Sequence, residues 1–413
     1  MSGLVVIGAS YAGIQAVLSA RDAGYCETIS VISDETWLPY QRPPLSKEFL
    51  LGRQNEAALT LRNSAFFTSR KIDLLLGIRA TEIDRDAQRV LLSDRATLTF
   101  GKLLIATGSC ARRLSAPGAD LDGVCYLRSM DDAIELRSRL QEAAEIVIVG
   151  GGFIGLEVAA SASQLGKRVT LIESGPRLLM RAVSPIVSEF LLAMHRKHGV
   201  DVRLGENLVS IEGRNGKVVS VNCGQTCRIG ADLVVVGIGG LANSRIAEAA
   251  QLLCRDGIVV DDCAQTSDPR IYAAGDCTIH DNVFAEGWLR LESVQHAQDQ
   301  GKAAGLAIAG RSSPYVSVPR FWSDQYASKL QIAGISAGFD AHAVRGSIEE
   351  GKFSLFYYKG GRLVAVDSLD RSGDQMAARK LLAGRLTPSP EQVADPSFDF
   401  RSLMGLASET NAS

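Results

Sequence analysis

Two glycine turns carry the clearest chemical signal in this sequence. They lie at 8–13 and 150–155, each between an apolar run that predicts a strand and a segment with helical spacing. Gly150, Gly152 and Gly155 match the full G-x-G-x-x-G pattern. Such a turn lets a pyrophosphate approach backbone N–H groups at the N-terminus of a helix. Two turns predict two dinucleotide sites, and a protein with two dinucleotides usually passes electrons between them.

The first turn departs from the pattern at one position. Gly8 and Gly13 are present, but Ser10 replaces the middle glycine. Serine is small, so we expect a pyrophosphate to bind there with slightly different geometry. An acid follows the next apolar run in each copy, Asp34 in the first and Glu173 in the second, and these acids are candidate ribose ligands.

Glu173 also predicts which nicotinamide cofactor binds. A carboxylate accepts hydrogen bonds from two ribose hydroxyl groups and repels the 2′-phosphate of NADPH. The sequence therefore favours NADH, and Arg177, four residues later, weakens that preference slightly.

The order of strand and helix patterns predicts an α/β fold with two Rossmann-like dinucleotide-binding domains and a C-terminal α+β domain. We expect the first dinucleotide-binding domain at 1–110 and, after an interruption, at 241–315. The second is expected at 111–240. Aromatic strands between 353 and 367 indicate the C-terminal domain, 316–413.

The composition excludes several other classes of protein. The chain has 413 residues, a net charge of -2 and 46% hydrophobic residues, which is typical of a globular enzyme and not of a nucleic-acid-binding protein. No apolar stretch reaches the roughly 20 residues of a membrane span. A strand pattern starts directly after Met1–Gly3, which leaves no room for a signal peptide, and we therefore expect a cytoplasmic protein.

Cysteine and histidine spacing predicts no metal site. The eight cysteines include no C-x-x-C pair. His195 and His198 fall on a predicted helix without the glutamate of a zinc-protease motif, so we expect both on a solvated helix face.

Six short motifs occur along the chain: Arg42–Lys47, Ala106–Gly108, Gly150–Glu157, Gly275–Cys277, Glu292–Ala297 and Phe321–Tyr326. Together they resemble the NADH-dependent ferredoxin reductases of bacterial oxygenase systems, from Val5 to about Asp370. The resemblance implies a glutathione-reductase-like fold with FAD in the first dinucleotide-binding domain and NADH in the second. It also implies hydride transfer from NADH to FAD, followed by single-electron transfer to a 2Fe–2S ferredoxin that serves a cytochrome P-450 or a Rieske-type oxygenase.

The resemblance also implies the ligands of both cofactors. For FAD they are Gly8, Ala12, Gly13, Asp34, Arg42, Lys47, Ala80, Thr107, Gly108, Arg128, Asp276, Val294 and Trp322. For NADH they are Gly150, Gly152, Phe153, Ile154, Gly155 and Glu173.

Three of the implied residues lie close to the chemistry. Lys47 is expected near the flavin, in an ion pair with Glu157 that rearranges when NADH binds. Trp322 is expected beside the flavin ring. Without the resemblance, Lys47 is better interpreted as a solvated lysine at a helix start, and Trp322 as a core aromatic residue.

We expect no iron–sulfur site in the chain itself, so the electrons must leave to a partner protein. Four cations are expected to border the exit towards an acidic ferredoxin: Arg290, Lys302, Arg311 and Lys329. The sequence leaves the oligomeric state open, although a monomer is favoured.

Two other functions remain open. The first is a rubredoxin reductase or an NADH oxidase. The second is an NADH-sensing flavoprotein resembling apoptosis-inducing factor. Disulfide reduction is not expected, because 40–47 contains no cysteine.

Overall fold

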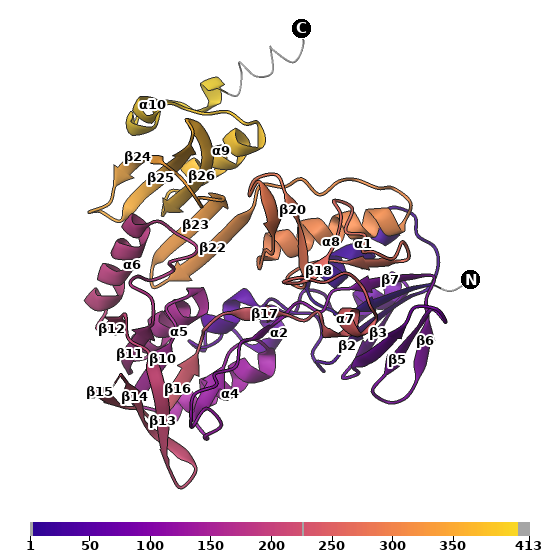
Figure 1. Ribbon diagram of the computed structural model, residues 1–413, viewed down its shortest axis with the longest axis horizontal. Helices are drawn as coiled ribbons and strands as arrows, with labels where there is room; N and C mark the ends of the chain where they lie inside the picture. Colours follow the sequence, from indigo (N-terminus) through magenta and orange to yellow (C-terminus); the bar gives the residue numbers. More distant parts are fainter. Residues whose placement is uncertain (1–2, 225–226, 404–413) are drawn as a thin grey trace. The chain divides into compact units, whose positions relative to one another are not determined.

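The computed structural model describes residues 3–224 and 227–403 (Figure 1). The chain divides into two compact units, each built from three segments. Unit 1 comprises Met1–Gln41, Thr60–Cys110 and Leu241–Phe321. Unit 2 comprises Arg42–Leu59, Ala111–Gly240 and Trp322–Ser413.

A five-stranded parallel sheet forms the centre of unit 1, in the order β19-β7-β1-β2-β3. Its strands are β1 (Leu4–Ile7), β2 (Ile29–Ser33), β3 (Ile72–Leu76), β7 (Lys102–Ile105) and β19 (Ile271–Ala273). All four residues of β1 are buried, as a central parallel strand requires. Helices α1 (Tyr11–Asp22) and α8 (Val294–Ile308) lie side by side (Figure 1). Glycine permits this approach, since a Cβ at Gly301 would lie 2.5 Å from the Ala12 carbonyl oxygen.

Smaller elements complete unit 1. An antiparallel sheet contains β4 (Ala80–Asp84), β5 (Arg89–Leu92) and β6 (Thr97–Thr99). Another sheet contains β18 (Ile258–Val259), β20 (Thr278–Asn282) and β21 (Gly287–Leu289). The helices are α3 (Ser64–Ser69) and α7 (Arg245–Ala249). The two short strands where the chain passes between units are β8 (Ser109–Ala111) and β17 (Gly240–Ala242).

Unit 2 contains a second five-stranded parallel sheet, in the order β12-β11-β10-β16-β9. Its strands are β9 (Val124–Tyr126), β10 (Glu145–Val149), β11 (Arg168–Glu173), β12 (Asp201–Leu204) and β16 (Leu233–Val236). An antiparallel sheet of β13 (Leu208–Arg214), β14 (Lys217–Cys223) and β15 (Cys227–Gly230) follows. The helices are η1 (Pro43–Ser46), α2 (Glu56–Leu59), α4 (Met130–Glu142), α5 (Phe153–Gln164) and α6 (Pro185–Lys197).

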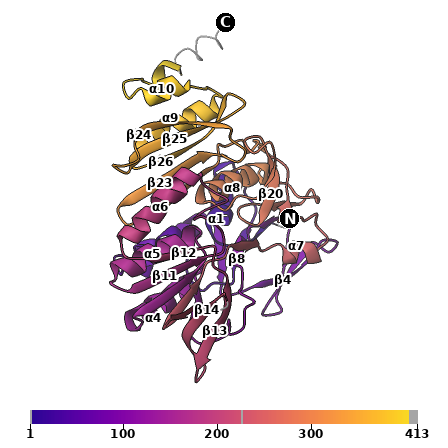
Figure 2. The same ribbon diagram turned by 60° about the vertical axis from the view of Figure 1, so that its left-hand side comes forward.

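The C-terminal part of unit 2 is a five-stranded sheet in the order β22-β23-β26-β25-β24. Its strands are β22 (Arg320–Gln325), β23 (Ser328–Gly334), β24 (Ala341–Ser347), β25 (Lys352–Lys359) and β26 (Arg362–Leu369). Helices α9 (Ser372–Ala383) and α10 (Pro390–Ala394) pack against it (Figure 2). Phe353, Phe356 and Tyr357 are fully buried in its core.

The two parallel sheets share one arrangement. In each, the strand that ends in a glycine turn is central, and the next strand along the chain pairs beside it. The carboxyl ends of parallel strands meet at one edge, which is where such sheets bind ligands. The predicted fold class is confirmed. Within the described part of the chain, none of the helices has the length and apolar character needed to span a bilayer.

Candidate functional site

The glycine turn of unit 2 has an open position at its centre. Gly150 has a φ of +109°, and a Cβ there would lie 2.4 Å from the Gly237 carbonyl oxygen. A Cβ at Gly155 would lie 2.0 Å from the carbonyl oxygen of Gly150. Gly152 differs, because its φ is -81° and a Cβ there would lie 3.8 Å from its nearest neighbour, the Gly237 carbonyl oxygen. Packing explains Gly150 and Gly155, whereas Gly152 leaves space at the start of α5 that suits a pyrophosphate.

The side chains that follow Gly152 suit the same space. Ile154 is 43% exposed although it is apolar, and Phe153 is half-buried. Both lie in the first turn of α5, directly after Gly152.

Glu173 lies directly beside this turn. Its Oε2 accepts the Gly151 N–H at 2.6 Å, and its Oε1 accepts the Gly175 N–H at 2.6 Å. The Ser174 hydroxyl also donates to Oε1, at 3.4 Å, so Oε2 is the oxygen that retains an open acceptor position. The Arg177 guanidinium forms its hydrogen bonds elsewhere. It donates to the carbonyl oxygens of Val183 and Met180 at 2.7 Å each.

The turn of unit 1 repeats this construction. Gly8 has a φ of +113°, and a Cβ there would lie 2.1 Å from the carbonyl oxygen of Ala106. A Cβ at Gly13 would lie 2.0 Å from the Gly8 carbonyl oxygen. Ser10 occupies the position of Gly152, which among the three motif glycines of unit 2 is the one where a Cβ would meet no close neighbour. It is the N-cap of α1, with extended backbone and no capping hydrogen bond from its side chain.

The predicted ribose acid of unit 1 sits differently from that of unit 2. Gly8 N–H donates to the carbonyl of Ile32, as Gly150 N–H does to that of Ile172. When the two units are aligned by these bonds, Ile32 corresponds to Ile172. Asp34 then lies one residue beyond the position that corresponds to Glu173. Asp34 is exposed and forms an ion pair with Arg79, at 3.1 Å.

Other predicted residues gather at the carboxyl edge of the unit 1 sheet. Thr107 and Gly108 follow β7, and Asp276 follows the neighbouring β19. The Ser109 hydroxyl donates to Asp276 Oδ2 at 3.3 Å. Val294 is the first residue of α8 and is half-buried.

Three further predicted residues occupy clear positions. Ala12 is buried in the first turn of α1, where its Cβ lies 3.0 Å from the position of a Cβ at Gly275. Ala80 begins β4 and is half-buried. In unit 2 the Arg42 guanidinium donates to the Arg128 carbonyl oxygen at 2.7 Å, which brings these two residues together.

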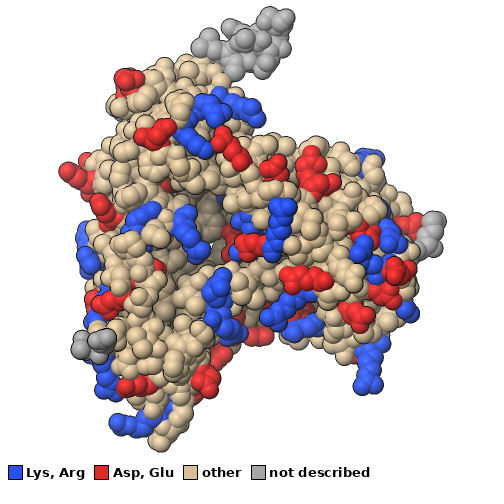
Figure 3. All heavy atoms as spheres, in the orientation of Figure 1, with Lys and Arg blue, Asp and Glu red and all other residues tan. Residues whose placement is uncertain are grey.

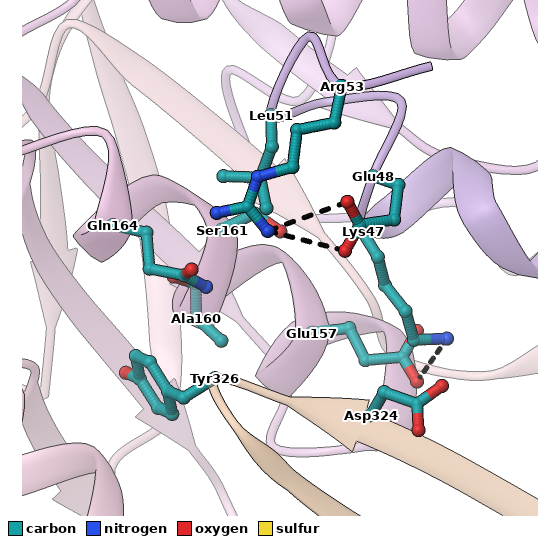
Figure 4. Close-up of a pocket in the computed structure, with 10 residues that line it drawn as sticks. All are labelled: Lys47, Glu48, Leu51, Arg53, Glu157, Ala160, Ser161, Gln164, Asp324 and Tyr326. Atoms are coloured by element: carbon teal, nitrogen blue, oxygen red, sulfur yellow. Dashed lines mark hydrogen bonds and ion pairs between the residues drawn. The ribbon is translucent and has the colours of Figure 1, made fainter.

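Lys47 and Glu157 form an ion pair inside unit 2 (Figure 4). Lys47 Nζ lies 2.9 Å from Glu157 Oε1, and the side chains are 13% and 4% exposed. The Ser46 hydroxyl donates to Glu157 Oε2 at 2.5 Å, and the Ser323 hydroxyl donates to Oε1 at 2.7 Å. Burial raises the pKa of Glu157, while Lys47 and the two hydroxyl groups oppose that rise.

A small pocket of ≈ 30 Å³ adjoins this ion pair. Lys47, Glu157 and Asp324 line it, and the exposed Arg53–Glu48 pair lies at another part of its wall (Figure 4). Trp322 stands two residues before Asp324 in β22 and is half-buried. The pocket therefore combines a buried charge pair with access for a small polar group.

The predicted basic residues do not share one environment. Arg290 is paired with Asp256 at 3.2 Å and with Glu292, so two carboxylates balance its charge. Lys302, Arg311 and Lys329 are exposed. On the face drawn in Figure 3, cationic and acidic side chains are interspersed.

The expectation for His195 is wrong. His195 is 0% exposed, because α6 turns it towards β22, where its Nε2 lies 2.9 Å from Gln325 Oε1. Burial lowers the pKa of His195 to about 4. His198, the C-cap of α6, is exposed. In residues 3–224 and 227–403, no group of His, Cys, Asp and Glu side chains has the arrangement of a metal site.

Several residues at these sites were not predicted from the sequence. Ser46 and Ser323 contact Glu157 across 111 and 166 residues of chain, a pairing that no local pattern reveals. Gln300 accepts the Gly275 N–H at 2.8 Å from within α8. A glutamine in the buried stripe of a helix is a recognisable signal of a buried polar contact, although it does not identify the partner.

Comparison with known proteins extends these observations. The model of the pyridine nucleotide-disulphide oxidoreductase family matches residues 2–301, and that of the reductase C-terminal domain matches 320–404. Rhodocoxin reductase of Rhodococcus erythropolis is 42% identical over 408 residues, 99% of this chain and 96% of the relative. Rubredoxin-NAD(+) reductase of Pseudomonas putida is 40% identical over 367 residues, 89% of this chain and 95% of the relative.

A solved structure agrees with these matches. The crystal structure of the ferredoxin reductase for the CYP199A2 system from Rhodopseudomonas palustris has a TM-score of 0.95 and 39% sequence identity to this chain. The match covers 97% of this chain and 99% of that one. The chain therefore belongs to the pyridine nucleotide-disulphide oxidoreductase family.

Proposed function

We propose that this protein is an NADH-dependent ferredoxin reductase, which takes a hydride from NADH onto FAD and passes single electrons to a 2Fe–2S ferredoxin. The ferredoxin would serve a cytochrome P-450 or a Rieske-type oxygenase. The observation that carries the proposal is the match, over nearly the whole of both chains, to a ferredoxin reductase of a P-450 system. The proposal includes a cytoplasmic location, where NADH is available as a reductant.

The two glycine turns fit the cofactors of the family, FAD and NAD(H). When bound, FAD accepts two electrons as a hydride and releases them one at a time. In unit 1 we assign the pyrophosphate to the turn at 8–13, the adenosine ribose to Asp34, the ribityl chain to Asp276 and the edge of the isoalloxazine ring to Val294. The remaining unit 1 ligands in this proposal are Ala80, Thr107 and Gly108.

In unit 2 we assign the pyrophosphate of NADH to Gly152 and the first turn of α5. Glu173 would bind the adenine ribose through the acceptor position of Oε2 that Gly151 leaves open. Its negative charge supports NADH over NADPH, because a 2′-phosphate would meet a carboxylate already fixed by two backbone hydrogen bonds.

The Lys47–Glu157 pair is assigned to the nicotinamide and flavin side of the reaction. Lys47 supplies a positive charge that favours the reduced flavin, and Glu157 holds that charge in place through the ion pair at 2.9 Å. Arg42, Arg128 and Trp322 complete the residues of unit 2 that we assign to FAD. Trp322 would cover the ring and limit access of water.

The cations that we propose to attract the acidic partner are Lys302 and Arg311 in unit 1 and Lys329 in unit 2, all of them exposed. Arg290 is a weaker candidate than the sequence indicated, because Asp256 and Glu292 already neutralise it. Charge complementarity of this kind raises the association rate with an acidic carrier and weakens with added salt.

Rubredoxin is the second candidate acceptor, and the 40% identity to a rubredoxin reductase favours it. The deciding experiment measures NADH-dependent reduction of cytochrome c by the FAD-loaded protein with a 2Fe–2S ferredoxin, with rubredoxin, or with no carrier. The proposal expects rapid reduction only with ferredoxin. Three other results would each contradict the proposal. Rapid reduction with rubredoxin alone would indicate a rubredoxin reductase, and rapid oxygen consumption without a carrier would indicate an NADH oxidase. A long-lived NADH complex with very slow turnover would indicate an NADH-sensing flavoprotein.

A further inference from the structure

A continuous series of hydrogen bonds, buried except at its Tyr326 end, connects Glu157 with α6. It runs through Ser323, Gln325, His195 and Tyr326, all within unit 2. The donor–acceptor distances are 2.7 Å from Ser323 Oγ to Glu157 Oε1, 3.0 Å from Gln325 Nε2 to Ser323 Oγ, 2.9 Å from His195 Nε2 to Gln325 Oε1 and 3.2 Å from Tyr326 Oη to His195 Nδ1.

The positions of these groups follow from β22 and α6. Ser323 and Gln325 are two residues apart in one strand, so both point to the same face. Ser323, Gln325 and His195 are 1%, 2% and 0% exposed. Polar groups buried this deeply must find their partners within the protein. Each link of the series therefore depends on the next.

The direction of every bond can be derived from Glu157. An ionised carboxylate only accepts hydrogen bonds, so the Ser323 hydroxyl must donate to it. The Ser323 oxygen then accepts from an amide N–H of Gln325, which turns Gln325 Oε1 towards His195. That oxygen requires a proton on His195 Nε2. In the neutral ring, Nδ1 then has no proton, and it accepts from the Tyr326 hydroxyl.

We propose that Ser323, Gln325 and His195 are positioning residues, which orient the Glu157 carboxylate and keep it ionised for its ion pair with Lys47. This inference rests on the proposed function, in which that ion pair lies at the nicotinamide site. The reductase C-terminal domain thereby contributes to the reaction through Ser323 and Gln325 of β22, without a requirement that either residue touch a cofactor.

The two oxygens of Glu157 have different partners. Oε1 accepts from both Lys47 and Ser323, whereas Oε2 accepts from Ser46. Loss of the Ser323 hydroxyl leaves Lys47 as the sole partner at Oε1 and raises the pKa of Glu157 further. Three more charged groups line the pocket beside the pair: Glu48, Arg53 and Asp324. His198 lies beside the other end of the series, stacked on Tyr326.

The first test reads the tautomer of His195 directly and needs no NADH. The chain has five histidines, so nitrogen NMR of histidine-labelled holoenzyme, with a His195→Gln variant for assignment, is practical. The expected result at neutral pH is a neutral ring protonated on Nε2. A Gln325→Met variant lacks the acceptor oxygen for Nε2–H, so we expect its His195 ring to lose the preference for a proton on Nε2. A charged ring, or one protonated on Nδ1, would overturn the proposal.

The second test measures the rate of flavin bleaching by NADH as a function of pH, under anaerobic conditions. Ser323→Ala is expected to move the midpoint of the profile upward by about one pH unit, because a hydrogen bond to a charged group is lost. Ser323→Thr, which keeps the hydroxyl group, is expected to restore the wild-type midpoint. The matched control is Ser354→Ala, a buried serine in the same sheet that bonds Ser368 and Asp374.

The proposed function and the positioning role fail in different ways. If the wild-type protein is not bleached by NADH, the proposed function is wrong. If the wild type is bleached and Ser323→Ala has the same pH profile as wild type and Ser354→Ala, only the positioning role is wrong. If Ser323→Ala does not fold, the tautomer measured in the wild type still decides the question.

Discussion

The Glu173 carboxylate, at the end of β11, binds the backbone of the glycine turn at 150–155. Helix α5 and strand β11 lie between the two in the sequence. The two oxygens of Glu173 accept N–H groups of Gly151 and Gly175, both at 2.6 Å. The same side chain thus holds the turn at Gly151 and presents a negative charge at the position that we assign to the adenine ribose. This double use explains why a change at Glu173 should alter cofactor choice as well as local stability.

Changing Glu173 to Gln should reduce the preference for NADH. The charge that repels a 2′-phosphate is removed, while one acceptor oxygen remains. We expect the ratio of kcat/KM for NADH to that for NADPH to fall by about tenfold or more. Glu142→Gln, an exposed acid at the end of α4, is the control and should leave the ratio unchanged. An unchanged ratio in Glu173→Gln would remove the assigned role of this carboxylate.

Alanine substitutions at Gly152 and Gly155 should separate binding from folding. A Cβ at Gly152 has free space, so Gly152→Ala should cost no more than about 1 kcal/mol of stability but strongly weaken NADH binding. A Cβ at Gly155 would lie 2.0 Å from the Gly150 carbonyl oxygen, so Gly155→Ala should destabilise the fold by more than about 2 kcal/mol. Denaturant unfolding and NADH titration of each variant check both effects; normal NADH affinity in Gly152→Ala would contradict the binding assignment.

The Lys47–Glu157 pair should show strong energetic coupling. Lys47→Met or Glu157→Gln alone leaves a buried charged or polar group without its partner, and each should cost about 3 kcal/mol of unfolding free energy. The double variant should cost clearly less than the sum. The exposed Arg53–Glu48 pair, with side chains 57% and 43% exposed, is the control and should couple by less than about 1 kcal/mol. Additive effects at Lys47 and Glu157 would mean that the pair is not formed in solution.

His195 should make the protein less stable in mild acid. Its pKa is lowered in the folded state to about 4, from 6.5, so the unfolded chain binds the proton more readily. The contribution of His195 to the free energy of unfolding is therefore fully present above pH 6.5. Up to about 3 kcal/mol of that free energy is lost as pH falls from 6.5 towards 4. Thermal unfolding across this range should show a smaller loss in His195→Gln than in wild type. His342→Gln, which alters an exposed histidine, should follow the wild-type curve.

Local patterns predicted the parts of the fold that local physics determines. The turns at 8–13 and 150–155 follow from chain geometry, because glycine alone fits beside a carbonyl oxygen 2.0–2.4 Å from its missing Cβ. The same reasoning explains Ser10, which replaces the middle one of the three motif glycines, where in unit 2 that constraint is absent. Strand runs such as 146–149 were evident because a central parallel strand is apolar on both faces.

Contacts between distant segments were not predictable in the same way. His195 lies on a helix whose sequence allows a solvated face, yet β22, more than a hundred residues later, buries it. The sequence around Arg290 predicts a surface cation. The structure places Asp256 beside it, 34 residues away in the chain, and this contact could not be predicted locally. Ser46 and Ser323 gain their importance only from the position of Glu157, since isolated serines carry no pattern of their own.

The most direct test of the proposed electron transfer is an anaerobic stopped-flow experiment on the FAD-loaded protein with excess NADH and an oxidised 2Fe–2S ferredoxin. We predict loss of the flavin absorbance first, followed by loss of the iron–sulfur absorbance in proportion to the ferredoxin added. Flavin that stays oxidised in the presence of NADH, or reduced flavin that never transfers electrons to any ferredoxin tested, would contradict it.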